Sequence, residues 1–264
     1  MKLFALSTLG ADHTRTSLFM APSMGDHARG LAVFFHGRNG APDQPQIIEG
    51  AAALARHGFT VLVPALPCSA PNTATGTAGG TPERFTMTQH YEDAARVLDC
   101  AGKGGSAALG APAGPVLAMG HSMGAYAALR LAAERGAGVI GAVLAVSAVV
   151  SGNAILAARE AMGPAALEAL EREVPGATAE YATHDLEPLA PALTQPAAFL
   201  TGTRDGLTRP GDVARFASLL VSPFVATIPD AEHCPSGAAY GIALDRALGA
   251  IAASWPPVMP PSAG

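Results

Sequence analysis

The feature of this sequence that most restricts its fold is the pentapeptide Gly-His-Ser-Met-Gly at residues 120–124. The apolar, strand-like residues 114–119 precede it, and the alanine-rich, helix-like residues 125–134 follow it. Glycine two residues before and after a serine, between a strand and a helix, is typical of a turn so sharp that larger side chains would collide with neighbouring backbone. The pattern therefore predicts a strand, a tight turn and a helix, with Ser122 at the tip of the turn.

A serine in this position stands over a helix N-terminus, where backbone N–H groups and the helix dipole favour negative charge. That arrangement is typical of a nucleophile, so the pattern predicts a serine hydrolase with Ser122 as its nucleophile. An unassisted serine hydroxyl is weakly reactive at neutral pH. It needs a base within hydrogen-bond reach and an acid that orients the base.

Among the eight histidines, His233 is the strongest candidate for the base. It follows the last predicted core strand, on a loop that returns to the carboxyl edge of the sheet, where Ser122 is also expected. His184 is the second candidate. Four others are interpreted as exposed polar residues: His13, His27, His57 and His90.

Asp205 is the favoured orienting acid, since it lies in Thr-Gly-Thr-Arg-Asp-Gly at the end of the preceding predicted strand. The alternative is that Asp205 only forms an Asx-turn before Gly206. Asp212 is expected in the first turn of the next helix. Asp230 and Glu232 are too close to His233 in the chain to be favoured, but both stay open. The resulting order of Ser122, Asp205 and His233 is the one that the motif and this type of fold require together.

A tetrahedral intermediate also needs hydrogen-bond donors for its oxyanion. We expect one from the backbone N–H of Met123, directly after the serine. The second is expected from the backbone N–H of Arg38, in the glycine-containing loop of residues 36–40 that follows an apolar strand. The Arg38 side chain has two interpretations: it faces an anionic acyl group, or it is solvated.

Along most of the chain, continuously apolar strand-like stretches are separated by helix-like stretches. This order is typical of a parallel sheet covered by helices on both faces. The predicted strands of this sheet are residues 31–35, 59–63, 114–119, 139–146, 196–201 and 223–228, and the predicted helices are 42–57, 83–102, 125–134, 211–220 and 237–253. Residues 2–8 and 14–20 are expected to form an antiparallel edge.

Between residues 151 and 192 the strand–helix alternation is interrupted: two helical pieces, at 154–162 and 164–174, precede a polar stretch. We expect this segment to be a lid inserted into a single domain. The predicted organisation is a core of residues 1–150 and 193–255, a lid of residues 151–192, and a Pro-rich tail of residues 256–264. The long loop of residues 67–81 is expected to be either part of the acyl-pocket rim or a mobile segment.

Residues 30–255 resemble the α/β-hydrolase superfamily. Four motifs occur in the order found there: His36-Gly37 after an apolar strand, the Gly-His-Ser-Met-Gly turn, the Asp205 turn and the late Glu-His loop. The resemblance implies an α/β fold with an eight-stranded, mostly parallel sheet, helices on both faces and a small helical lid. It also implies ester hydrolysis without a cofactor. His121 resembles the residue that packs beside the serine in this superfamily.

Composition excludes several classes of protein. With 49% hydrophobic and only 14% charged residues, the chain is not of the disordered class. Its net charge of −5 and pI near 5.9 also argue against nucleic-acid binding, which requires a basic surface. The longest apolar run, residues 139–150, is too short to cross a bilayer. The three cysteines, Cys68, Cys100 and Cys234, lack metal-ligand spacing, so no metal site is expected.

An odd number of cysteines predicts reduced thiols or buried small hydrophobes in a reducing compartment, hence a cytoplasmic protein. The predicted function is hydrolysis of a small-molecule carboxylic ester with a small or medium acyl group, through an acyl-enzyme. The same machinery leaves an acyltransferase, a thioesterase or a peptidase open. A non-catalytic ligand-binding protein of the same fold is a further alternative, and the oligomeric state is left open.

Overall fold

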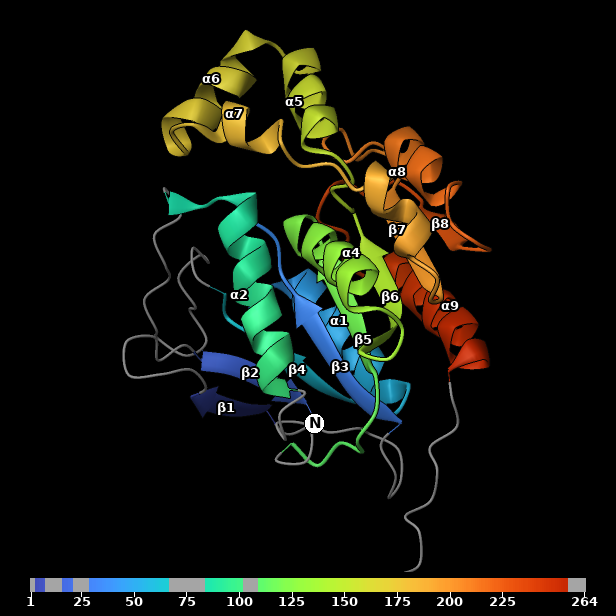
Figure 1. Ribbon diagram of the computed structural model, residues 1–264. Coiled ribbons are helices and arrows are strands. Elements are labelled where there is room, and N and C mark those ends of the chain that lie inside the picture. The colour runs from blue at the N-terminus through green and yellow to red at the C-terminus, as the bar shows by residue number, and fades with distance from the viewer. Residues whose placement is uncertain (1–2, 8–15, 21–28, 67–83, 102–108, 256–264) are drawn as a thin grey trace, which may run out of the picture.

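The computed structural model describes five parts of the chain, namely residues 3–7, 16–20, 29–66, 84–101 and 109–255. The predicted tail of residues 256–264 and the loop of residues 67–81 lie outside the described residues. Figure 1 shows a central sheet with helices on both sides and a separate group of short helices above one end.

The sheet has eight strands in the order β1-β2-β4-β3-β5-β6-β7-β8. The strands are β1 Leu3–Ser7, β2 Thr16–Met20, β3 Gly30–Phe35, β4 Phe59–Val63, β5 Val116–His121, β6 Ile140–Val146, β7 Ala197–Gly202 and β8 Phe224–Ile228. The last six run parallel, while β1 pairs antiparallel with β2 and β2 pairs antiparallel with β4. The predicted α/β fold and its antiparallel edge are confirmed.

The central strands are almost entirely apolar, as expected for strands that are covered on both faces. In β3, Leu31, Val33 and Phe35 enter one hydrophobic cluster, whereas Ala32 and Phe34 enter the other. Helices α2 Met87–Cys100, α4 Met123–Arg135 and α8 Pro210–Ala217 cover the first face, and α1 Pro45–Arg56 and α9 Ala238–Ser254 cover the second. Each predicted core helix is present, with ends that differ by a few residues.

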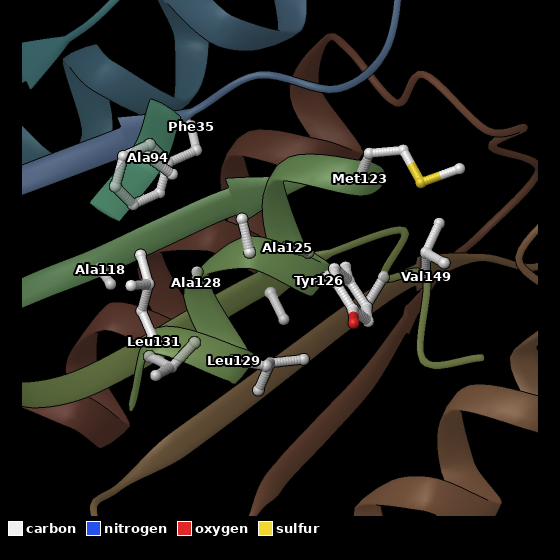
Figure 2. Close-up of a cluster of buried hydrophobic side chains, with 14 of the residues drawn as sticks. Phe35, Ala94, Ala118, Met123, Ala125, Tyr126, Ala128, Leu129, Leu131 and Val149 are labelled. Atoms are coloured by element: carbon white, nitrogen blue, oxygen red, sulfur yellow. The ribbon is translucent and has the colours of Figure 1, made fainter. Parts of the chain in front are cut away.

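Helix α4, which follows the Gly-His-Ser-Met-Gly turn, is buried along most of its length (Figure 2). Four of its five alanines, Ala125, Ala127, Ala128 and Ala132, are completely buried. Small side chains allow a helix to approach a strand closely, and the resulting contacts fix the position of the helix. The first turn of α4 is therefore held rigidly over the end of β5.

The segment of residues 151–192, here called the insertion, leaves the sheet after β6 and returns to it at β7. It contains α5 Gly152–Ala161, α6 Pro164–Glu173, α7 Ala177–Tyr181 and the 3-10 helix η3 Glu187–Ala192. The first two agree with the predicted helical pieces, while the last two lie within or just beyond the stretch predicted to be polar. A β-bridge between Ser151 and Asp185 joins the two arms of the insertion.

Two of the three cysteines are described, and both Cys100 and Cys234 are unpaired and exposed. Their interpretation as buried small hydrophobes is therefore wrong, and they are surface thiols. In the described parts of the chain, no helix combines the length and apolar character that crossing a membrane requires.

Candidate active site

The site is built on the sharp turn between β5 and α4. Ser122 has φ 56° and ψ −118°, a strained conformation for a residue with a side chain. A Cβ atom on Gly120 would lie 2.3 Å from the carbonyl carbon and oxygen of Gly124, and one on Gly124 would lie 2.1 Å from the Phe35 carbonyl oxygen. Only glycine is tolerated at both positions, which is the steric reason for the sequence pattern.

His233 reaches the serine from the loop after β8. Its Nε2 lies 3.0 Å from Ser122 Oγ, a normal hydrogen-bond distance. The backbone carbonyl of His233 accepts a hydrogen bond of 2.9 Å from Nε2 of His121. Burial, aided by the nearby His233, lowers the pKa of His121 to about 4, so at neutral pH His121 is an uncharged donor that holds this loop in place.

Asp205 lies on the other side of His233. Its Oδ2 is 3.0 Å, and its Oδ1 3.2 Å, from His233 Nδ1. Burial opposes ionisation of Asp205, but its hydrogen bonds and its contact with His233 outweigh burial and hold its pKa at about 2. The carboxylate is therefore charged at neutral pH and fixes the orientation of the imidazole.

The turn after Asp205 contributes a residue that the sequence analysis missed. Thr208 Oγ1 donates to Asp205 Oδ2 over 2.6 Å, and its backbone N–H donates to Oδ1 over 2.8 Å. Leu207 N–H also donates to Oδ1, over 3.0 Å, so Asp205 forms the Asx-turn as well as the contact with His233. A threonine three residues after an aspartate is a signal for such a turn.

The predicted oxyanion turn lies against the serine. A Cβ atom on Gly37 would lie 2.9 Å from Ser122 Cβ and 3.4 Å from its Oγ, so Arg38 directly follows a backbone in contact with Ser122. The backbone N–H groups of Arg38 and Met123 donate no hydrogen bond to another residue in the described parts of the chain. Both amides are therefore available as donors.

His36 and His90 stabilise this turn. His36 Nδ1 donates to the Gly37 carbonyl over 2.9 Å, and His36 Nε2 accepts from the Leu66 N–H over 3.1 Å. His90 Nε2 donates to the His36 carbonyl over 2.9 Å. The interpretation of His90 as an exposed residue is wrong, because it is buried, and burial lowers its pKa to about 3.

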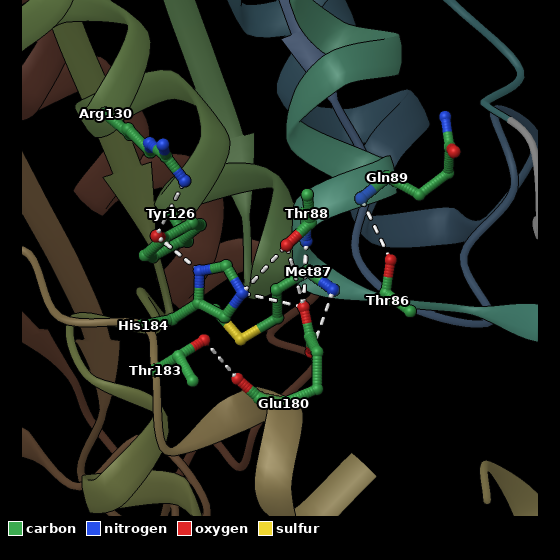
Figure 3. A network of polar contacts seen from close by, with 9 residues as sticks. All are labelled: Thr86, Met87, Thr88, Gln89, Tyr126, Arg130, Glu180, Thr183 and His184. Atoms are coloured by element: carbon green, nitrogen blue, oxygen red, sulfur yellow. Dashed lines mark hydrogen bonds and ion pairs between the residues drawn. The ribbon is translucent and has the colours of Figure 1, made fainter. Parts of the chain in front are cut away.

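His184, the second candidate for the base, has a different environment (Figure 3). Its Nδ1 lies 2.9 Å from the Tyr126 hydroxyl and its Nε2 lies 2.6 Å from Glu180 Oε1. Glu180 in turn accepts hydrogen bonds from Thr88 at the start of α2. Both ring nitrogens are engaged, and the network anchors the insertion to α2 and α4.

The remaining candidates have other partners or lie elsewhere. Asp212 pairs with Arg209 over 2.9 Å, and His57 pairs with Asp245 over 3.2 Å. Glu232 is exposed, and the backbone carbonyl of Asp230 accepts a hydrogen bond from Arg204. His13 and His27 lie outside the described residues.

The Arg38 side chain is not solvated, contrary to one of the two interpretations. It is 14% exposed and its Nη1 lies 3.1 Å from Oε1 of Glu173, in α6 of the insertion. At the other end of the site, a Cβ atom on Gly206 would contact Met162 Cε, also from the insertion, at 3.4 Å. The insertion therefore contacts both the oxyanion turn and the Asp205 turn.

Comparison with protein families gives a match over residues 32–261 to the model of the alpha/beta hydrolase family. The match covers most of the sequence. The chain belongs to the alpha/beta hydrolase family. No curated protein is similar enough in sequence to this alpha/beta hydrolase to count as a relative.

Solved structures similar to this alpha/beta hydrolase include esterases. Est1E from Butyrivibrio proteoclasticus has a TM-score of 0.71 at 14% identity, over 96% of this chain and 98% of its own. An esterase from Pyrococcus furiosus has a TM-score of 0.72 at 14% identity, over 96% and 91%. Alpha/beta hydrolase domain-containing protein 10 from mouse has a TM-score of 0.67 at 15% identity, over 96% and 99%. At such low identity these similarities establish the fold.

Proposed function

We propose that this alpha/beta hydrolase is a carboxylic-ester hydrolase that acts on small or medium acyl groups through an acyl-enzyme. The observation that carries the proposal is the pair of 3.0 Å contacts linking Ser122 Oγ to His233 Nε2 and His233 Nδ1 to Asp205 Oδ2. A nucleophile, a base and a buried acid in this geometry form the machinery of acyl transfer. The esterases among the similar structures support the choice of an ester as substrate.

In the first half of the reaction, His233 Nε2 removes the Ser122 hydroxyl proton as Oγ attacks the ester carbonyl carbon. The carbonyl oxygen becomes an oxyanion, which accepts hydrogen bonds from the backbone N–H groups of Arg38 and Met123. Asp205 stabilises the positive charge that His233 acquires. The intermediate then collapses, the C–O bond to the alcohol breaks, and His233 returns the proton to the leaving alkoxide.

In the second half, water takes the place of the alcohol. His233 removes a proton from this water as its oxygen attacks the acyl carbon, and the same two amides hold the second oxyanion. Collapse breaks the bond to Ser122 Oγ, and His233 gives its proton back to the serine. The acid is released, and no cofactor or metal takes part in this cycle.

We further propose that the insertion, residues 151–192, acts as a lid on the core formed by residues 1–150 and 193–255. Its contacts with both turns of the site, through Glu173 and Met162, support this role. The exposed free thiols of Cys100 and Cys234 support a reducing compartment such as the cytoplasm.

Hydrolysis of p-nitrophenyl acetate and butyrate tests the proposed function. We expect Ser122→Ala to reduce kcat by at least about 10⁴-fold, because the nucleophile is lost. Ser236→Ala, which removes an exposed hydroxyl two residues beyond Cys234, should retain the wild-type rate. A wild-type rate in Ser122→Ala would refute the proposal. Transfer of the acyl group mainly to an added alcohol would identify an acyltransferase instead.

A further inference from the structure

Next to the proposed nucleophile, the oxyanion turn and the insertion enclose a group of charged and polar side chains. Asn39 Nδ2 donates to Glu173 Oε1 over 2.7 Å, and Arg38 Nη1 lies 3.1 Å from the same oxygen. The buried Nη1 of Arg38 is close to this carboxylate, yet it has no hydrogen-bond acceptor of suitable geometry among the described residues. Because Gly37 contacts Ser122, the Arg38 backbone is held beside the nucleophile.

Arg159, in α5 of the insertion, brings a second positive charge to this place. Burial and the positive charge of Arg38 lower the pKa of its guanidinium group. No described carboxylate forms an ion pair with Arg159. Its Nη1 makes a long hydrogen bond of 3.4 Å to the Ala166 carbonyl, and its buried Nε has no acceptor within the described parts of the chain. Arg159 is thus a partly buried cation with no carboxylate at ion-pair distance among the described residues, and it shares the more distant charge of Glu173 with Arg38.

Tyr181, in α7, supplies an unused hydroxyl. The residue is 1% exposed, and its hydroxyl has no hydrogen-bond partner among the residues that the structure describes. A buried tyrosine hydroxyl normally has a partner. Burial raises its pKa to about 12, although the charges of Arg38 and Arg159 act in the opposite direction. Helix α7 packs against α5, which carries Arg159, and against α6, which carries Glu173, so Tyr181 belongs to the same packed group of helices.

The charges at this place do not balance. Arg38 and Arg159 contribute two positive charges and Glu173 one negative charge. Glu180, the other carboxylate that influences Tyr181, is bound by His184 and Thr88. Partly buried cations are costly unless they are paired, so binding of one further negative charge is favoured beside Arg38 and Arg159.

We propose that Arg38, Arg159 and Tyr181 bind a carboxylate on the acyl part of the substrate, which makes the substrate a half-ester of a short dicarboxylic acid. This inference rests on the proposed ester hydrolysis. Guanidinium groups bind carboxylates through paired N–H donors, and the Tyr181 hydroxyl adds a further donor. A carboxylate supplies one negative charge, whereas a phosphate dianion beside Glu173 would bring an excess of negative charge.

The test compares monoethyl glutarate with its neutral isostere, ethyl 4-carbamoylbutanoate, by measuring release of ethanol. We expect the wild-type enzyme to have a kcat/KM for the carboxylate about tenfold or more above that for the amide, because hydrogen bonds to charged groups are the strong ones. Arg159→Gln should reduce this ratio about tenfold, and Tyr181→Phe severalfold. Glutarate should inhibit hydrolysis of p-nitrophenyl butyrate competitively in the wild type, and more weakly in both variants.

Arg172→Gln is the matched control, since Arg172 is an exposed arginine of the same insertion, and its ratio should equal that of the wild type. A wild-type ratio of one or less would overturn the proposal. So would an unchanged ratio in Arg159→Gln and Tyr181→Phe, even with lower activity toward both esters, because this would assign them a structural role only. Ser122-dependent hydrolysis of p-nitrophenyl butyrate reports on ester hydrolysis separately, so failure of the subsite and failure of the esterase proposal give different results.

Discussion

At the scale of single residues, the environment of Asp205 determines how well His233, the proposed base, is oriented. Three hydrogen bonds from Leu207 and Thr208 hold the carboxylate, and His233 Nδ1 is a fourth donor. Thr208 Oγ1 also lies 3.3 Å from His233 Nδ1, so this hydroxyl is placed against both groups. Thr208 is therefore a positioning residue in the proposed mechanism.

We expect Thr208→Val to reduce kcat about tenfold, because loss of a hydrogen bond to a charged group typically costs about 1.5–3 kcal/mol. KM should change little, since Thr208 acts through Asp205 and His233. Steady-state kinetics with p-nitrophenyl butyrate provide the measurement. Thr208→Ser keeps the hydroxyl and should restore most of the rate; a serine variant as slow as the valine variant would argue against this role.

Sequence alone could predict that Ser122, Asp205 and His233 lie close together, because each follows a strand with a clear apolar pattern and the carboxyl ends of parallel strands meet at one edge of the sheet. The partners of the Arg38 side chain could not be predicted in the same way. Glu173 belongs to the insertion, and the sequence does not reveal how its short helices pack on the core. His90 was misjudged for a similar reason, since its partner, the His36 carbonyl, is distant in the chain.

At the scale of structural elements, the site depends on how closely α4 approaches β3 and β5. The space for a Cβ atom on Gly124 is filled by the carbonyl oxygens of Phe35 and His36, at 2.1 and 2.6 Å. These are backbone atoms of β3 and of the turn that carries Arg38, so they cannot move without displacing the proposed oxyanion donor. The packing of these elements and the geometry of the site are thus coupled.

Gly124→Ala should lower the free energy of unfolding by about 2–4 kcal/mol and abolish activity, because it separates α4 from β3. Urea denaturation and ester hydrolysis measure the two effects. Gly138→Ala is the control, since a Cβ atom there meets nothing within 4 Å, and it should change stability by less than about 1 kcal/mol. Equal stability of the two variants would contradict the packing described for the turn.

The alternation of elements made the sheet and its covering helices predictable, as did the strand pair at its edge. Helix α7 and η3 were missed because they are short and lie in a polar stretch with no periodic pattern. Tertiary contacts hold α7 instead: the Tyr181 carbonyl packs so closely on Gly152 that a Cβ atom there would lie 1.8 Å from it. Such contacts cannot be recognised in a local window of sequence.

At the scale of the whole molecule, buried histidines link stability to pH. The pKa values of His90 and His121 fall from 6.5 to about 3 and about 4 on folding, and that of Asp205 falls from 3.8 to about 2. Below pH 6.5 the unfolded chain therefore binds more protons than the folded protein. Stability must rise with pH across the range between these values, and acidification must reduce it.

We expect the free energy of unfolding to fall by a few kcal/mol between pH 7 and pH 4, measured by urea denaturation at a series of pH values. His121→Gln keeps a donor for the His233 carbonyl but cannot titrate, so its stability should depend less steeply on pH. A wild-type stability that is constant or increases on acidification to pH 4 would contradict the neutral, buried state assigned to both histidines.

The central claim is that Ser122 carries the acyl group, and rapid-quench peptide mass spectrometry with p-nitrophenyl butyrate tests it most directly. We predict that the peptide containing Ser122 gains a butyryl group within the first turnover, and that His233→Ala slows this acylation by several orders of magnitude. Turnover with the butyryl group on another nucleophile, such as the exposed Cys234 thiol beside His233, and with Ser122 unmodified throughout, would contradict the account.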